Sequence, residues 1–173
     1  MPPAAVRLRR KRRSGFGGCW TRPFPPWAYL WTKPPDRVAD LLNRGVIQIA
    51  QLHGREGEED LARLRALAPG RPLWQAFRLR QPEDAAPANA SSADSILLDS
   101  GRGSGEAFDW ALLSAIRRPY FLAGGLGPET VADALCTLHP YGVDVSSGIE
   151  TDHKKDAEKM AAFVAAVRKG DAL

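Results

Sequence analysis

The sequence predicts an α/β protein built on a parallel sheet, and two observations carry this prediction. Short apolar segments begin near residues 46, 73, 95, 120 and 142, so they recur every 22 to 27 residues. Each interval between them holds one segment with apolar residues at helical spacing. Continuous apolar strands separated by single helices are typical of buried parallel sheets. The pattern therefore indicates either a doubly wound sheet or part of a (β/α)8 barrel.

The elements follow one another regularly from residue 34 onward. The five predicted strands are 46–52, 73–79, 95–99, 120–123 and 142–146. Helices are predicted around 38–42, 61–67, 108–116, 131–138 and 160–167, with a further short helix opening at Glu83. Gly45 stands where a helix C-cap is expected, and Pro128 is expected in the first turn of its helix. The 173 residues are too few for a complete barrel, which takes about 200 or more.

Charge divides the chain into two predicted parts, a leader at 1–35 and a domain at 36–173. The leader has eight basic residues and no acidic one, whereas the domain has 16 bases and 20 acids. The basic cluster at 7–13 could neutralise phosphates while Trp20 and Trp27 stack on bases, but no nucleic-acid-binding motif accompanies it, so we do not expect nucleic-acid binding. A disordered cap and a stretch foreign to the domain are the other two interpretations. Residues 27–31 are aromatic-rich and lie between prolines, which favours an edge strand.

Composition also excludes several classes of protein. No stretch reaches the roughly 18 uncharged apolar residues of a membrane-spanning helix, so we expect no integral membrane protein. The arginine-rich start lacks the apolar stretch of a secretory signal. Two cysteines, Cys19 and Cys136, cannot build a disulfide framework, so we expect a cytoplasmic protein. Cys136 and His139 are three residues apart without a further clustered ligand, so we expect no metal site.

Polar and glycine residues follow every predicted strand. In parallel α/β folds, ligands bind at the carboxyl ends of the strands. Those ends here are His53-Gly54, Arg78, Asp99-Ser100, Gly124-Gly125 and Ser146-Ser147-Gly148. A lone Gly-Gly is explained by a tight turn, but the Ser-Ser-Gly one strand later favours a phosphate site formed by both loops.

A series of motifs resembles the phosphoribosylanthranilate isomerase family of tryptophan biosynthesis, over about residues 34–168. The motifs are Gln51-Leu52-His53-Gly54, Ile96-Leu97-Leu98-Asp99-Ser100, Gly103-Ser104-Gly105 with Phe108-Asp109-Trp110, Leu122-Ala123-Gly124-Gly125-Leu126 with Pro128-Glu129, and Val143-Asp144-Val145-Ser146-Ser147-Gly148-Ile149-Glu150. The resemblance implies an incomplete (β/α)8 TIM barrel of the ribulose-phosphate-binding type, in which the five predicted strands are the fourth to eighth.

The resemblance also implies a reaction and its residues. The family carries out an Amadori rearrangement that opens the ribose ring of a sugar-phosphate substrate, with a general acid at the ring oxygen and a general base at the C2 proton. It implies no cofactor and no metal. Asp99 matches the general acid, and desolvation of a carboxyl group favours the protonated form that a proton donor needs. Gly124, Gly125, Ser146, Ser147 and Gly148 match the phosphate site. Asp144 matches a polar position near the substrate, and His53 and Arg78 are weaker candidates for contacting it.

The sequence departs from the family at the general base. The family uses a cysteine in a Lys-Ile-Cys-Gly first strand that has no match here, and the surroundings of Cys19 differ from that motif. Cys136 is expected in the core. We therefore expect little or no turnover by the chain as written. We expect that the leader derives from a misread gene start. We also expect self-association through open edges at the strands near Val46 and Ser146. A non-catalytic phosphate-binding fragment, or a protein that interacts through its basic leader, is the alternative.

Overall fold

The computed structural model describes residues 5–6, 27–30, 34–54, 56–99 and 110–170. The basic cluster at 7–13, Cys19 and Trp20, and the motif segments at 100 and 103–109 lie outside these residues. The chain forms two compact units: Arg10–Ala76 with Ser92–Asp94, and Met1–Arg9 with Phe77–Ser91 and Ser95–Leu173. Strands β2 to β7 pair in parallel where they are neighbours within a unit, and they alternate with helices along the chain, which confirms the predicted α/β class.

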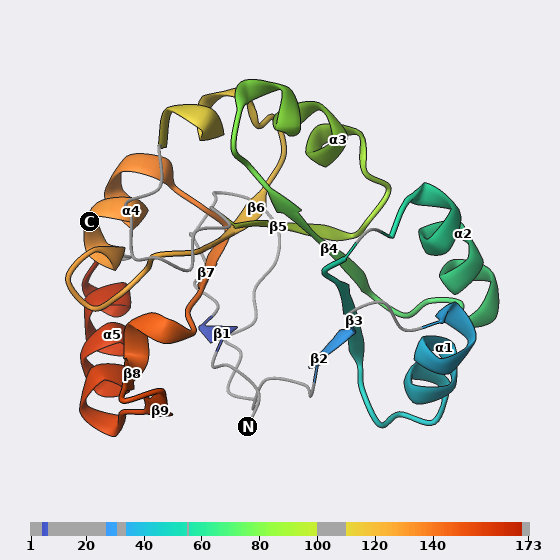
Figure 1. Ribbon diagram of the computed structural model, residues 1–173, viewed down its shortest axis with the longest axis horizontal. Coiled ribbons are helices and arrows are strands. Elements are labelled where there is room, and N and C mark those ends of the chain that lie inside the picture. Colours follow the sequence, from blue (N-terminus) through green and yellow to red (C-terminus); the bar gives the residue numbers. More distant parts are fainter. Residues whose placement is uncertain (1–4, 7–26, 31–33, 55, 100–109, 171–173) are drawn as a thin grey trace, which may run out of the picture. The chain divides into compact units, whose positions relative to one another are not determined.

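The unit that begins at Arg10 packs two helices against its strands. Its elements are β2 (Trp27–Leu30), α1 (Pro35–Asn43), β3 (Ile49–Leu52), α2 (Glu58–Leu67) and the first part of β4 (Leu73–Arg78). Figure 1 shows α1 and α2 side by side. Ala50 and Leu52 of β3 enter the same buried cluster as Leu42 of α1 and Leu61 of α2. Burial of one apolar stripe on each helix therefore stabilises this unit.

The first predicted helix ends as expected, but the following strand starts later than predicted. Gly45 follows the C-cap residue Arg44 with φ of +70°, the left-handed conformation that commonly ends a helix. The backbone N–H groups of Val46 and Ile47 both donate to the Leu41 carbonyl, at 3.0 and 3.4 Å. Because these bonds turn the chain back onto the helix, the strand begins only at Ile49.

The expectation of open strand edges near Val46 and Ser146 is wrong. Strand β2 pairs in parallel with β3 over its whole length, from Trp27 opposite Ile49 to Leu30 opposite Leu52. Strand β1 (Ala5–Val6) pairs antiparallel with β7, which places Val6 opposite Val143. The edge strand predicted at 27–31 is confirmed, since β2 ends the sheet order beside β3. The backbone groups that were expected to recruit another chain therefore have partners within this one.

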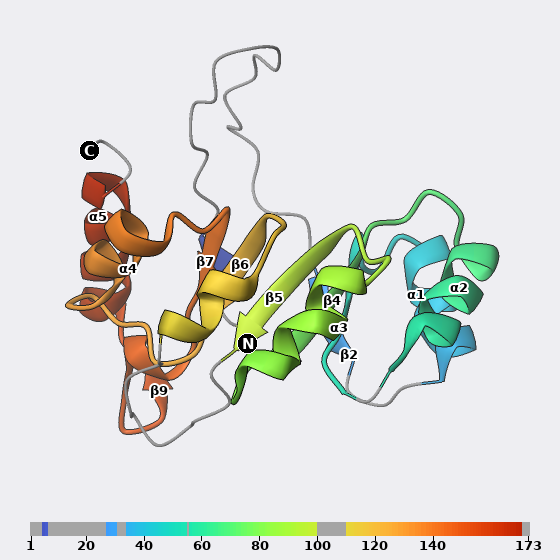
Figure 2. The same cartoon turned by 90° about the horizontal axis from the view of Figure 1, so that it is seen from above.

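The other unit holds β1, the last two residues of β4 and eleven further elements. These are η1 (Pro82–Asp84), α3 (Ala85–Ala90), β5 (Ser95–Asp99), η2 (Trp110–Ala115), β6 (Tyr120–Ala123), α4 (Val131–Leu138), β7 (Gly142–Asp144), η3 (Ser147–Ile149), β8 (Glu150–Thr151), β9 (Lys154–Lys155) and α5 (Ala157–Gly170). Figure 2 shows α4 and α5 packed together beside β6 and β7. Their buried side chains, among them Val131 and Phe163, form one cluster with Leu122 and Val143.

Alternation along the strands separates the core from the site. Leu98, Leu122 and Val143 belong to the cluster under the helices. Successive side chains in a strand point to opposite faces, so Asp99, Ala123 and Asp144, which follow these three residues directly, face the other side of the sheet. The apolar packing of one face thereby fixes the direction of polar groups on the other.

Three details of the second unit differ from prediction. The helix expected around 108–116 is the 3-10 helix η2, and Phe108 lies outside the described residues. Pro128 precedes α4 by a separate turn, in which the N–H groups of Thr130 and Val131 donate to the Gly127 carbonyl at 3.2 and 3.0 Å. Cys136 is exposed and not in the core. The buried positions of α4 are Val131, Ala134 and Leu135, and Cys136 lies around the helix from that stripe.

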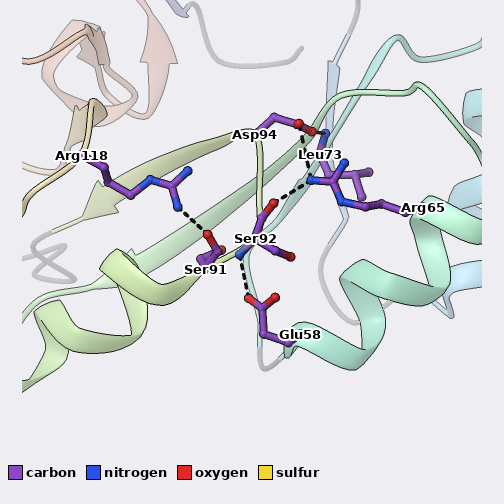
Figure 3. A network of polar contacts seen from close by, with 7 residues as sticks. All are labelled: Glu58, Arg65, Leu73, Ser91, Ser92, Asp94 and Arg118. Atoms are coloured by element: carbon purple, nitrogen blue, oxygen red, sulfur yellow. Dashed lines mark hydrogen bonds and ion pairs between the residues drawn. The ribbon is translucent and has the colours of Figure 1, made fainter.

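Side-chain bonds hold the segment between α3 and β5, as Figure 3 shows. Glu58 of α2 accepts from the Ser92 N–H at 3.0 Å, and Arg65 donates to the Ser92 carbonyl at 2.6 Å. Asp94 accepts from the N–H of Leu73 at 2.8 Å and pairs with Arg65 at 3.4 Å. In the other unit, Arg118 donates to the carbonyl of Ser91. These bonds satisfy backbone groups that the loop would otherwise leave unpaired.

Candidate phosphate and acid site

Two glycine residues turn the chain immediately after β6. Gly124 has φ of +84° and Gly125 has φ of +67°, both in the left-handed region that side chains disfavour. Gly125 is exposed, whereas Leu126 is buried in the core cluster and anchors the loop. The backbone of this turn can therefore reach a ligand with no side chain in between.

The loop after β7 packs directly against this turn. A Cβ on Gly148 would stand 1.9 Å from the carbonyl oxygen of Leu126, closer than any real contact. Residue 148 must therefore be glycine for the two loops to meet. The structure thus brings together the two segments that the sequence singled out, Gly124-Gly125 and Ser146-Ser147-Gly148.

Backbone donors are available where these loops meet. Ser147 and Gly148 open the 3-10 helix η3, in which Ile149 N–H is the first to bond, donating to the Ser146 carbonyl at 3.4 Å. Among the described residues, none accepts a hydrogen bond from the N–H groups of Gly125, Ser147 or Gly148. Ser146 and Ser147 are exposed and add their hydroxyls. Unbonded backbone N–H groups on two loops in contact suit an anion.

Two carboxylates flank Ala123, one residue before the glycine turn. Asp99 of β5 is in register with Ala123 of β6. Val143 is in register with Leu122, so Asp144 lies level with Ala123 on the other side. Since neighbouring strands are about 4.8 Å apart, the two aspartate Cα atoms are separated by roughly 10 Å. Asp144 is 5% exposed and Asp99 is half-buried, and the residue between them, Ala123, has a side chain of one methyl group.

Arg78 ends β4 near the same edge. The N–H of the next residue, Leu79, donates to the Asp99 carbonyl at 3.1 Å, which joins the ends of β4 and β5. Arg78 itself is exposed. His53 follows β3 in the other unit, where the Gln51 amide Nε2 lies 3.3 Å from its Nδ1. The structure thus places Arg78 beside the strand end that carries Asp99. His53 belongs to the other unit.

Sequence reasoning missed a hairpin next to the serine loop. Strands β8 and β9 pair antiparallel, and the connecting residues Asp152 and His153 have φ of +52° and +59°, as a two-residue hairpin turn of type I′ requires. From β9, the Lys155 ammonium donates to Ser146 and Glu150. The sequence signal that could have revealed this contact is the pair Lys154-Lys155, which lies within ten residues of Ser146 and Ser147.

Asp156 fixes this hairpin to α5. Its Oδ1 accepts from the N–H groups of Glu158 and Lys159 at 2.9 and 3.1 Å, which caps the helix, and its Oδ2 accepts from the Thr151 hydroxyl at 2.7 Å. The Thr151 hydroxyl, followed by the Lys159 backbone N–H, lowers the pKa of Asp156. Lys159 also donates from Nζ to the Glu150 carbonyl at 2.7 Å. The bonds of Asp156 and Lys159 therefore fix the segment that follows Ser146 to the start of α5.

The described residues contain neither a cluster of metal ligands nor a membrane-spanning helix. Over 34–54, 56–99 and 110–170, no cluster of three or more His, Cys, Asp or Glu side chains is placed to hold a metal ion. The described part of the chain also has no helix with the length and apolar character needed to cross a bilayer.

Parallel strands with intervening helices, and a strand-end edge that carries glycine turns, define an α/β protein of the TIM-barrel type. The model of the N-(5'-phosphoribosyl)anthranilate (PRA) isomerase family matches residues 32–166. N-(5'-phosphoribosyl)anthranilate isomerase of Acetivibrio thermocellus is 38% identical over 150 residues, which cover 79% of this chain and 68% of that protein. The chain therefore belongs to the phosphoribosylanthranilate isomerase family.

Solved structures agree with this assignment. Phosphoribosyl anthranilate isomerase from Thermococcus kodakaraensis superposes with a TM-score of 0.67 at 35% identity, over 81% of this chain and 73% of that one. A phosphoribosyl anthranilate isomerase in complex with reduced 1-(o-carboxyphenylamino)-1-deoxyribulose 5-phosphate superposes with a TM-score of 0.67 at 28% identity, over 83% of this chain and 71% of that one.

Proposed function

We propose that this chain acts in the isomerisation of N-(5'-phosphoribosyl)anthranilate to 1-(o-carboxyphenylamino)-1-deoxyribulose 5-phosphate, a step of tryptophan biosynthesis. The observation that carries the proposal is the register of Asp99 with Ala123 on the neighbouring strand. Ala123 lies one residue before the Gly124-Gly125 turn, and the loop after that strand contacts the loop that contains Gly148. A carboxyl group and an anion-binding loop are then both within reach of one sugar phosphate. We also propose a cytoplasmic location, where such a biosynthetic step would take place.

The phosphate group would bind where the two loops meet. The N–H groups of Gly125, Ser147 and Gly148 and the Ser146 and Ser147 hydroxyls supply donors without a full positive charge. Preformed backbone donors hold a phosphate at one end of the substrate and orient the sugar along the sheet edge. Gly124 provides the turn that exposes Gly125.

Asp99 would act as the general acid. Protonation of the ribose ring oxygen breaks its bond to C1 as the anthranilate nitrogen lone pair forms the C1–N double bond, and loss of the C2 proton to a base then gives the enol, which tautomerises to the ketone. Asp144 faces the same side and would contact the sugar hydroxyls. Arg78, at the exposed end of β4, would contact a carboxylate or hydroxyl of the substrate.

No described residue matches the base cysteine of the family, because the only cysteine among them is Cys136, exposed on α4. This observation favours a second candidate function, phosphate-ester binding without turnover. An assay of purified protein with freshly prepared N-(5'-phosphoribosyl)anthranilate, with the ketose product measured by chromatography, decides between the two. Product formation that Asp99→Asn abolishes supports the isomerase. Binding of inorganic phosphate without product supports the second function, and absence of both contradicts each proposal.

A further inference from the structure

The ammonium group of Lys155 contacts three oxygen atoms, two of Ser146 and one of Glu150. Nζ lies 2.6 Å from Glu150 Oε1, 2.9 Å from the Ser146 carbonyl oxygen and 3.3 Å from Ser146 Oγ. An ammonium has three N–H donors, so these acceptors use all of them. The Lys155 and Glu150 side chains are only 23% and 22% exposed, which indicates a held geometry.

These contacts determine what the Ser146 hydroxyl can do. A serine hydroxyl has one hydrogen to donate and two lone pairs to accept with. Lys155 donates to one lone pair, and among the described residues none accepts the hydroxyl hydrogen. A hydroxyl that accepts from a cation is polarised and becomes a better donor. Ser146 is exposed beside Ser147, so its hydroxyl hydrogen is accessible to a ligand of the loop.

We propose that Lys155 is a positioning residue of the phosphate site: held by Glu150, it fixes the Ser146 carbonyl and hydroxyl so that the hydroxyl hydrogen points to the bound phosphate. The inference rests on the proposed function, because it assumes that the loop binds phosphate. Lys155 acts through Ser146 and does not itself contact the anion, since its three donors are used within the protein.

Positioning and simple charge attraction predict opposite effects of Glu150→Gln. If Lys155 only attracted the anion, removal of the neighbouring negative charge would strengthen phosphate binding. If Glu150 holds Lys155 in place, loss of the 2.6 Å ion pair releases the lysine and weakens binding. Glu150→Gln keeps the size and a weaker acceptor, so the hairpin is expected to fold.

The experiment is titration of the full chain with inorganic phosphate, followed by ³¹P NMR or calorimetry. Lys155→Met should raise the Kd by about tenfold, the usual loss for a charged hydrogen bond. Glu150→Gln should raise it as well. Lys154→Met removes the same charge from the adjacent, exposed residue and should change the Kd by less than about twofold. Ser146→Ala should reduce the effect of Lys155→Met, which a double-mutant cycle measures.

The outcomes separate the inference from the proposed function. Wild-type protein that does not bind phosphate would overturn both. Wild-type binding with an unchanged Kd in Lys155→Met, tighter binding in Glu150→Gln, or equal losses in Lys154→Met and Lys155→Met would overturn the positioning role alone. Thermal melts of each variant exclude unfolding, and if Lys155→Met does not fold, the sign of the Glu150→Gln effect decides.

Discussion

Gly148 packs so tightly against Leu126 that a Cβ on the glycine would stand 1.9 Å from the leucine carbonyl oxygen. This contact joins the loops that follow β6 and β7, and it involves backbone atoms on both sides. Backbone atoms cannot move aside as the end of a flexible side chain can. The geometry of the proposed anion site therefore depends on glycine at position 148.

Gly148→Ala should separate the two loops and weaken binding of inorganic phosphate by at least about tenfold, with a loss of roughly 1–3 kcal/mol in the free energy of unfolding. Urea unfolding and phosphate titration measure the two effects. Gly127→Ala is the matched control, because a Cβ there would stand 3.7 Å from the Gly148 carbonyl oxygen, an ordinary contact. Equal phosphate binding in Gly148→Ala and wild type would contradict the proposed site.

The fold class was predictable because burial repeats along the chain. Strands β3 to β7 are apolar on the face under the helices, and Leu98, Leu122 and Val143 carry that signal in the sequence. Strand β2 was predictable from its aromatic residues between prolines. The pairing of β1 with β7 was not, because two residues are too few for a pattern and the partner is far away in sequence.

The candidate site was predictable only in part, for a related reason. Gly124, Gly125 and Gly148 were found because they follow two neighbouring predicted strands, and the structure gives the physical reason for glycine there, a positive φ or a backbone contact. The Lys155 contacts depend on a hairpin whose turn residues, Asp152 and His153, carry a weak sequence signal. Cys136 was misplaced because cysteine is usually buried, although its spacing from Val131, Ala134 and Leu135 turns it away from the buried face of the predicted helix.

Asp99→Asn should abolish turnover while phosphate binding stays within about twofold of wild type. An amide cannot donate the proton that opens the ribose ring, and general acid–base catalysis contributes about 10²- to 10⁴-fold. The measurement is kcat for N-(5'-phosphoribosyl)anthranilate in any form of the protein that is active, together with the Kd for inorganic phosphate. Asp133→Asn, at an exposed position of α4, is the control and should retain kcat. Full activity of Asp99→Asn would exclude it as the acid.

Gly142→Ala should destabilise the sheet by roughly 1–3 kcal/mol through overpacking. A Cβ on Gly142 would stand 2.6 Å from Phe121 Cε1, and the Phe121 ring packs edge-on against Tyr141 at a centroid distance of 5.4 Å. The ring therefore cannot move without losing that contact. Adding Phe121→Leu to Gly142→Ala should cost less than the sum of the two single changes, which urea unfolding of all three variants tests. Additive losses would show that the clash does not occur.

The Asp156 cap of α5 should make stability depend on pH in acid. The Thr151 hydroxyl and the Lys159 backbone N–H lower the pKa of Asp156 below its ordinary value of 3.8 in the folded state. A lowered folded pKa means that the carboxylate stabilises the protein above the unfolded value and that this contribution is lost as pH falls through the folded one. Asp156→Ala should therefore lower the Tm most above about pH 4 and progressively less below it.

Thermal melts followed by circular dichroism from about pH 2.5 to pH 7 measure this dependence, with wild type and Asp156→Ala compared at each pH. Asp156→Asn keeps an oxygen for the helix N–H groups but has no charge to lose, so its Tm should fall less steeply with acid than that of wild type. Asp133→Ala, at an exposed position near the start of α4, should lower the Tm by less. A Tm difference between wild type and Asp156→Ala that is constant across the range would show that the cap does not depend on the charge.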